Sequence, residues 1–218
     1  DKIGLMSCNP AIGGLAKGQL VREIDALGGE MGKITDSSGI HFKMLNKSKG
    51  PAVWSPRAQA DRKYYADVAK RKLQQQSGLE IIKGSVNNII IKKDQVHGVW
   101  LEDGRNLSAR AVILTTGTFL NGVIHIGLKS LKSGRAGEKP AMGITEALVN
   151  SGFESGRLKT GTPPRILKQS IDFSCFDEQK PDNPPSPFSY STREINRKQI
   201  SCYIGHTNSK THEALREG

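Results

Sequence analysis

The chain has 218 residues, with 36% hydrophobic side chains and 24 glycines, a composition typical of a globular protein with many turns. No apolar run approaches the roughly 20 residues that cross a bilayer, and no charged-then-apolar leader is present, so no membrane association is expected. Three cysteines are too few for a disulfide framework or a zinc site, which favours the cytoplasm and predicts no metal. The net charge of +11 and the pI near 9.7 favour a polyanionic partner, with nucleic acid ahead of a membrane surface.

Residues 7–18 combine a thiol, an Asn-Pro turn, two adjacent glycines and a lysine, and they lead into a helical pattern. Gly13 and Gly14 allow backbone angles that are closed to other residues, so the main chain there can approach a ligand closely. Backbone N–H groups at the start of the next helix would favour negative charge. The spacing alone leaves two interpretations open, a phosphate-binding loop and an ordinary loop that caps a helix.

The first half of the chain predicts two helices. Apolar residues recur at helical spacing over 20–27, and Gly28 with Gly29 ends that pattern. Residues 33–53 are irregular and basic. Ser55 followed by Pro56 is a strong helix-start signal and predicts a helix over 55–77. The cations of that helix suit phosphate binding, but a solvated helix face is the commoner explanation.

Short Ile- and Val-rich runs at 79–83, 85–92 and 95–101 alternate with turn residues, which predicts a β-meander over 79–108. The apolar run at 111–114 predicts a strand buried on both faces, as in a parallel sheet. Thr116 and Gly117 follow it in a turn of small residues. Open α/β sheets bind ligands beyond the carboxyl ends of such strands.

The second half is richer in loops. Residues 145–150 predict a short helix, 199–204 a strand and 207–215 a further helix. A loop over 173–191, rich in proline and serine, is predicted to be mobile. Residues 157–165 carry three cations among turn residues, namely Arg157, Lys159 and Arg165. This pattern suits either a phosphate-binding loop or a rigid surface turn.

Several blocks in this order resemble the glucose-inhibited division protein A family: residues 7–18, 48–52, 57–62, 117–120, 124–127 and 157–165. That family is the flavoprotein half of the bacterial enzyme that installs 5-carboxymethylaminomethyl groups on the wobble uridine of tRNA. The resemblance runs collinearly from about Met6 to the end of the chain.

The resemblance implies an α/β fold, with a glutathione-reductase-type (Rossmann-like) FAD-binding domain, a β-meander and an inserted α+β domain. Residues 1–120 would form part of the FAD-binding domain and residues 121–218 part of the inserted, substrate-binding domain. The implied cofactors are FAD, NADH as reductant and methylenetetrahydrofolate as one-carbon donor. The implied partners are tRNA, a second copy of the chain in a homodimer, and a tRNA-modification GTPase in a heterotetramer.

The resemblance also assigns site residues. Cys8 matches a cysteine beside the flavin and is a candidate for attack on uridine C6, although a lone cysteine is more often a small buried residue. Val86 matches a position whose backbone meets the adenine side of FAD, and Ala141 a position where another member has serine. The remaining candidates are the walls of the flavin site and the tRNA contacts: Asn9, Pro10, Gly13, Gly14, Thr116 and Gly117 for FAD, and Arg157, Lys159 and Arg165 for tRNA.

Three parts of the family pattern are absent from these 218 residues: the Gly-rich FAD fingerprint, a second cysteine motif and the helical C-terminal domain. We therefore expect a central fragment that is inactive by itself. Three alternatives remain open. They are a folate- and flavin-dependent tRNA uridine methyltransferase, a non-catalytic RNA-binding module and a small-molecule flavin oxidoreductase.

Overall fold

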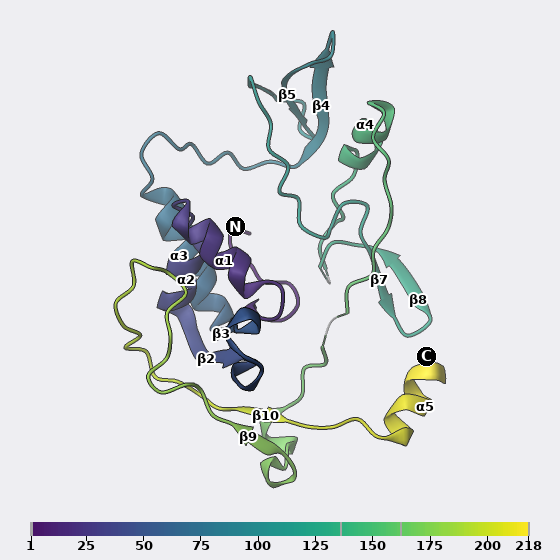
Figure 1. Ribbon diagram of the computed structural model, residues 1–218. Helices are drawn as coiled ribbons and strands as arrows, with labels where there is room; N and C mark the ends of the chain where they lie inside the picture. The colour runs from purple at the N-terminus through teal and green to yellow at the C-terminus, as the bar shows by residue number, and fades with distance from the viewer. Residues whose placement is uncertain (1, 136, 162, 218) are drawn as a thin grey trace. The chain divides into compact units, whose positions relative to one another are not determined.

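The computed structural model describes residues 2–135, 137–161 and 163–217 (Figure 1). The chain forms two compact units. The first unit comprises Asp1–Leu79 and Gly161–Asn208, and the second comprises Glu80–Thr160 and Ser209–Gly218. These units do not divide the chain at residue 120, because residues 161–208 return to the first unit. The assignment of 1–120 to an FAD-binding domain and of 121–218 to an inserted domain stays a prediction.

The first unit is built on a three-stranded antiparallel sheet in the order β1-β3-β2. Its strands are β1 (Ala11–Gly13), β2 (Gly39–Leu45) and β3 (Ser55–Ala60). Three helices belong to the same unit: α1 (Gly18–Ala26), α2 (Met31–Ser38) and α3 (Arg62–Gln74). Ala58 of the central strand lies opposite Ile12 on one side and Phe42 on the other.

Two apolar clusters form the core of the first unit. One joins α2, β3 and α3 through Ile34, Ala60, Tyr65, Val68 and Ala69. The other joins α1 and the sheet to a distant segment through Val21, Phe42, Ala58 and Phe188. Phe188 is only 1% exposed, so the segment that carries it is part of the core.

The predicted helix over 55–77 is wrong in its first third. Residues 55–60 form strand β3, and the helix begins after Asp61, whose carboxylate accepts a hydrogen bond from the Tyr64 N–H at 3.1 Å. Asp61 is therefore the helix cap that Ser55 was expected to be. Pro56 fits β3 because β1 pairs only with residues 57–59, so no hydrogen bond toward β1 is lost there.

Residues 33–53, predicted to be irregular, contain most of α2, all of β2 and two short 3-10 turns, η1 (Lys47–Lys49) and η2 (Pro51–Val53). The side chains of β2 lack clear alternation, so its strand character comes from pairing with β3 and not from its own pattern.

The segment predicted as a mobile loop over 173–191 contains η4 (Phe173–Cys175) and β9 (Asp177–Gln179). A further 3-10 turn, η3 (Lys168–Ser170), precedes them. Strand β9 pairs antiparallel with β10 (Cys202–Ile204), which lies within the strand predicted over 199–204. Two buried carboxylates accept hydrogen bonds from the backbone of residues 188–190, as described below.

The second unit confirms the predicted meander over its last two thirds. Strands β4 (Val86–Lys92), β5 (Gln95–Leu101) and β6 (Asn106–Ser108) pair antiparallel in sequence order, while residues 79–83 form no strand. The β4–β5 turn has positive φ at both Lys93 and Asp94, which suits a type I′ hairpin. The other elements are β7 (Val123–Ile126), β8 (Lys129–Lys132), α4 (Ile144–Asn150) and α5 (Ser209–Glu217).

The buried strand predicted over 111–114 is wrong. These residues form no strand, and Ile113 is 86% exposed. An apolar run becomes a buried strand only where neighbouring strands pair with it, and none of the pairings among the described residues includes it.

Mixed helix and strand content was predicted and is present. All the strand pairs described are antiparallel, and the one parallel contact among them is an isolated bridge between Leu120 and Ala141. Within the part of the chain that the structure describes, no helix combines the length and apolarity required to span a membrane.

Candidate functional site

Cys8 lies in the first unit, where two hydrogen bonds join its loop to residues far along the chain. The Cys8 thiol donates to the Gly161 carbonyl at 2.8 Å, and an Nη2 hydrogen of Arg165 donates to the Cys8 carbonyl at 2.8 Å. The structure thus brings together two of the predicted site residues, Cys8 and Arg165, which lie 157 residues apart in sequence.

The rest of the 7–18 stretch is held by strand β3. The Pro10 carbonyl accepts from the Ala60 N–H at 2.6 Å, and the Gly14 N–H donates to the Pro56 carbonyl at 2.8 Å. Gly13 has φ +76°, and a Cβ there would lie 2.3 Å from the Pro56 carbonyl oxygen and 2.7 Å from Phe188. Gly13 is therefore required for close packing inside the protein.

Asn9 belongs to the turn that precedes β1. Its carbonyl accepts the Ala11 N–H at 2.8 Å. Asn9 and Pro10 thus connect Cys8 to the edge strand β1, which begins at Ala11. The role of this stretch as a flavin-site wall stays a prediction.

The three predicted tRNA-contacting cations fall in different units. Arg165 belongs to the first unit, whereas Arg157 and Lys159 belong to the second. Arg157 donates to the Asn121 carbonyl at 3.1 Å, so its guanidinium supports a turn of its own unit. Thr162, in the middle of the 157–165 stretch, lies outside the described residues.

In the second unit, the predicted FAD residues lie on the meander and on the segments that follow it. Val86 opens β4 opposite Leu101. The Ala141 N–H donates to Phe119 at 3.1 Å and its carbonyl accepts from Asn121 at 2.8 Å, so only a carbonyl lone pair is left for a ligand. Thr116 and Gly117 are exposed, and Gly117 begins a turn with Thr118; Gly117 has φ +66°, and a Cβ there would meet no atom within 4 Å.

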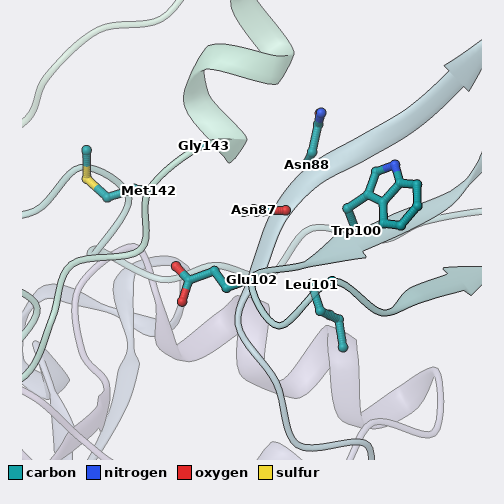
Figure 2. A pocket seen from close by; sticks show the side chains of 8 residues that line it. Asn87, Asn88, Trp100, Leu101, Glu102, Met142 and Gly143 are labelled. Atoms are coloured by element: carbon teal, nitrogen blue, oxygen red, sulfur yellow. The ribbon is translucent and has the colours of Figure 1, made fainter.

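A pocket of about 590 Å³ is lined by residues that include the sequence neighbours of Val86 and Ala141 (Figure 2). The residues that line it come from β4, from β5 with the turn after it, and from the segment before α4: Asn87, Asn88, Trp100, Leu101, Glu102, Gly104, Met142 and Gly143. Sequence reasoning missed this pocket. The available signal was a pair of asparagines and a tryptophan in adjacent meander strands, where apolar residues would otherwise be expected.

Burial shifts the pKa of several groups in the first unit. His41 is 1% exposed; its Nδ1 lies 2.8 Å from the Ile200 carbonyl and its Nε2 has no partner. Burial, with a smaller contribution from Arg57 and Lys43, lowers the pKa of His41, so the ring is neutral at pH 7. Burial also raises the pKa of the Cys202 thiol.

Among the described residues, no three His, Cys, Asp or Glu side chains are grouped as a metal site requires.

Comparison with known proteins identifies the class. The profile of the family described as "Glucose inhibited division protein A" matches residues 1–218. The chain therefore belongs to this family, as the sequence blocks predicted.

Individual relatives agree with that assignment. The chain is 55% identical over 215 residues to the "tRNA uridine 5-carboxymethylaminomethyl modification enzyme MnmG" of Thermodesulfovibrio yellowstonii, covering 99% of this chain and 34% of the relative. It is 54% identical over 220 residues to the protein of the same name from Chlorobium luteolum, covering 100% of this chain and 35% of the relative. The chain thus spans about a third of the length of these relatives.

A solved structure agrees with the fold. The chain matches Aquifex aeolicus GidA in its form II crystal with a TM-score of 0.92 and 49% sequence identity, over 99% of this chain and 37% of that one.

Proposed function

We propose that the chain is the central part of a flavin-dependent enzyme that adds a carboxymethylaminomethyl or aminomethyl group to C5 of the wobble uridine of tRNA. The observation that carries this proposal is the 55% identity, over nearly the whole chain, to a relative named for that modification. The net charge of +11 supports it as well, because tRNA is a polyanion.

Cys8 is the proposed nucleophile toward uridine C6. Its Sγ would bond to C6, the C5=C6 electron pair would move toward the O4 carbonyl, and the thiol proton would leave to solvent. C5 could then attack an electrophilic one-carbon unit. The thiol now donates to the Gly161 carbonyl, so this hydrogen bond must open before attack. Arg165, which binds the Cys8 carbonyl, would keep the backbone in place meanwhile.

FAD is the proposed cofactor, and when bound it supplies hydride acceptance and a carrier for a one-carbon unit, which side chains cannot provide. The residues proposed to hold it are Val86, Ala141, Thr116 and Gly117. They fit this role in part. There is open space beside Gly117, and Ala141 retains one carbonyl lone pair. NADH as reductant and methylenetetrahydrofolate as carbon donor follow from the family resemblance.

The proposed assembly is a homodimer that works with a tRNA-modification GTPase in the cytoplasm, where tRNA is found. A wobble base lies in a single-stranded loop, so turning it outward costs little. Arg157, Lys159 and Arg165 are proposed to contact phosphates around it. The guanidinium groups of Arg157 and Arg165 each donate one hydrogen bond to a carbonyl, which leaves their other N–H groups for phosphate.

The test is complementation. In a bacterial strain that lacks the corresponding gene, the full-length protein should restore the carboxymethylaminomethyl modification, measured by mass spectrometry of tRNA nucleosides. Cys8→Ser should abolish restoration, and Cys175→Ser, which changes an exposed thiol, should not.

Two results would contradict the proposal. Restoration of ribothymidine with no change at the wobble position would favour the methyltransferase alternative. Absence of flavin absorbance after FAD is added to the purified full-length protein would exclude a flavin-dependent reaction.

A further inference from the structure

We propose that the connection between β2 and β3 (Figure 1) is a platform for single-stranded RNA, in which Trp54 stacks against a base and Lys49 contacts a phosphate. The connection spans residues 46–54 and contains η1 and η2. The class of partner, RNA, rests on the proposed function, whereas the family resemblance assigns no role to either of these side chains.

The connection presents basic and apolar side chains to solvent. Residues 47–49 and 51–54 are all exposed, and Trp54 is 42% exposed. An indole so open to solvent is unusual, because tryptophan is highly buried on average. Residues 46–54 include two lysines and no acidic residue, so the indole belongs to a positively charged stretch of the chain.

Three hydrogen bonds hold Trp54 in place. Its indole N–H donates to the Lys47 carbonyl at 3.3 Å, and its backbone N–H donates to the Pro51 carbonyl at 3.2 Å. From α1, the Gln19 amide donates to the Trp54 carbonyl at 3.4 Å and also to the Ser55 hydroxyl at 3.2 Å. The ring is therefore ordered before any ligand arrives, so little conformational freedom is lost when a flat group stacks on it.

Lys49 is the cation available to a phosphate. The Lys47 ammonium lies 3.2 Å from the Asp182 carboxylate, so its charge is already compensated within the protein. Lys49 is exposed and forms no ion pair with another of the described residues. An ordered indole and an uncompensated ammonium on one short connection match the alternation of base and phosphate along a single strand.

The surroundings of Trp54 favour RNA over a protein partner. Tryptophan is common at protein interfaces too, but the core of such an interface is depleted of charged residues and lysine is rare there. Proteins that bind single-stranded nucleic acid combine aromatic rings with a positively charged surface. A duplex does not suit the platform, because its bases already stack on one another, so the partner is an unpaired segment such as a tRNA loop.

The experiment measures the affinity of the purified full-length protein for a labelled single-stranded oligouridylate of about 10 nucleotides, by fluorescence anisotropy. Trp54→Ala should weaken binding at least about fivefold, because the stacking of one base is lost. Trp54→Phe retains an aromatic ring and should keep most of the affinity. Circular dichroism checks that each variant folds.

The salt dependence separates the two roles. Lys49→Gln should weaken binding and reduce the slope of log affinity against log salt concentration by about 0.7, the contribution of one phosphate contact on a single strand. Trp54→Ala should leave that slope unchanged, because it removes no charge.

Phe153→Ala is the matched control for the aromatic ring. Phe153 is 63% exposed, but it is followed by Glu154 and has no lysine within three positions on either side. Its removal should leave the affinity for the oligouridylate unchanged. Binding of a blunt RNA duplex should also be unchanged in Trp54→Ala, because a duplex offers no unpaired base to the ring.

Three results would overturn the platform: single-stranded RNA binding by Trp54→Ala that equals that of the unaltered protein, an equal loss of duplex binding, or an unchanged salt slope in Lys49→Gln. The first of these would favour a protein contact as the use of the exposed ring.

The outcome is distinguishable from the test of the proposed function, because RNA affinity is measured without any modification reaction. An unaltered full-length protein that binds neither the oligouridylate nor tRNA would contradict both proposals. Normal tRNA modification with no effect of Trp54→Ala on RNA binding would contradict the platform alone.

Discussion

Two buried acidic side chains, Asp25 and Asp36, accept hydrogen bonds from the backbone of residues 188–190. The Asp36 carboxylate accepts the N–H of Phe188 at 2.7 Å and of Ser189 at 2.9 Å, and Asp25 accepts that of Tyr190 at 2.9 Å. These contacts place Phe188 in the core with Val21 and Phe42. The helices α1 and α2 thereby bind a segment more than 150 residues away in sequence.

Asp36→Asn should lower the free energy of unfolding by about 1–3 kcal/mol, because asparagine retains one acceptor for two N–H groups. The loss should depend on pH. Burial raises the pKa of Asp36 above 3.8, against the opposing effect of its hydrogen bonds. The folded state thus binds the proton more tightly than the unfolded state does. The resulting stabilisation is fully present below pH 3.8 and is lost as pH rises through the folded pKa.

The difference in unfolding free energy between the unaltered protein and Asp36→Asn should therefore decrease as pH rises from 3.8, as urea denaturation at several pH values would measure. Asp67→Asn, at an exposed position on α3, is the control and should change stability by no more than about 0.5 kcal/mol. A difference that grows with pH would contradict the assigned direction.

At the scale of elements, the pairing of β1 with β3 sets the position of the loop that carries Cys8. The two strands share three residue pairs, and the Pro56 carbonyl, which accepts the Gly14 N–H, extends this contact beyond them. Glycine at positions 13 and 18 leaves room for Pro56, because a Cβ at either position would lie within 2.5 Å of the Pro56 carbonyl oxygen. Gly13 and Gly18 are thus required for packing whatever else they contact.

Gly13→Ala should destabilise the protein more than Gly78→Ala. Both glycines have similar positive φ, +76° and +71°, so both substitutions incur about 1–2 kcal/mol of backbone strain. A Cβ at Gly13 also collides with β3, whereas at Gly78 it meets nothing within 4 Å. The collision should add about 1–3 kcal/mol, measured as a larger fall in melting temperature and unfolding free energy. Equal losses of stability in the two variants would show that β1 and β3 can shift to accommodate the Cβ at no cost in free energy.

At the scale of the whole molecule, charge is the feature that both units share. The net charge of +11 predicts that tRNA binding depends mainly on phosphate contacts and therefore on salt. The affinity of the full-length protein for tRNA should fall at least about tenfold between 50 and 200 mM monovalent salt, measured by filter binding. Affinity that does not change with salt would contradict an electrostatic interface.

The sequence alone determined the features that depend on neighbours along the chain. The helix after residue 18, the hairpin at Lys93 and Asp94, the meander and the helices near 145 and 209 follow from local periodicity and turn chemistry. Family membership also followed from the sequence, because long blocks of unusual composition identify a family without a fold.

Only the tertiary structure decided the remaining features. Residues 55–60 became a strand because β2 and β1 pair with them, and residues 111–114 did not because no described strand does. The Cys8–Arg165 contact joins residues 157 positions apart, and the pocket unites Asn87 with Trp100 and Met142. Each of these depends on long-range pairing or packing, whose free energy is realised only once distant segments meet, so no local window of sequence contains it.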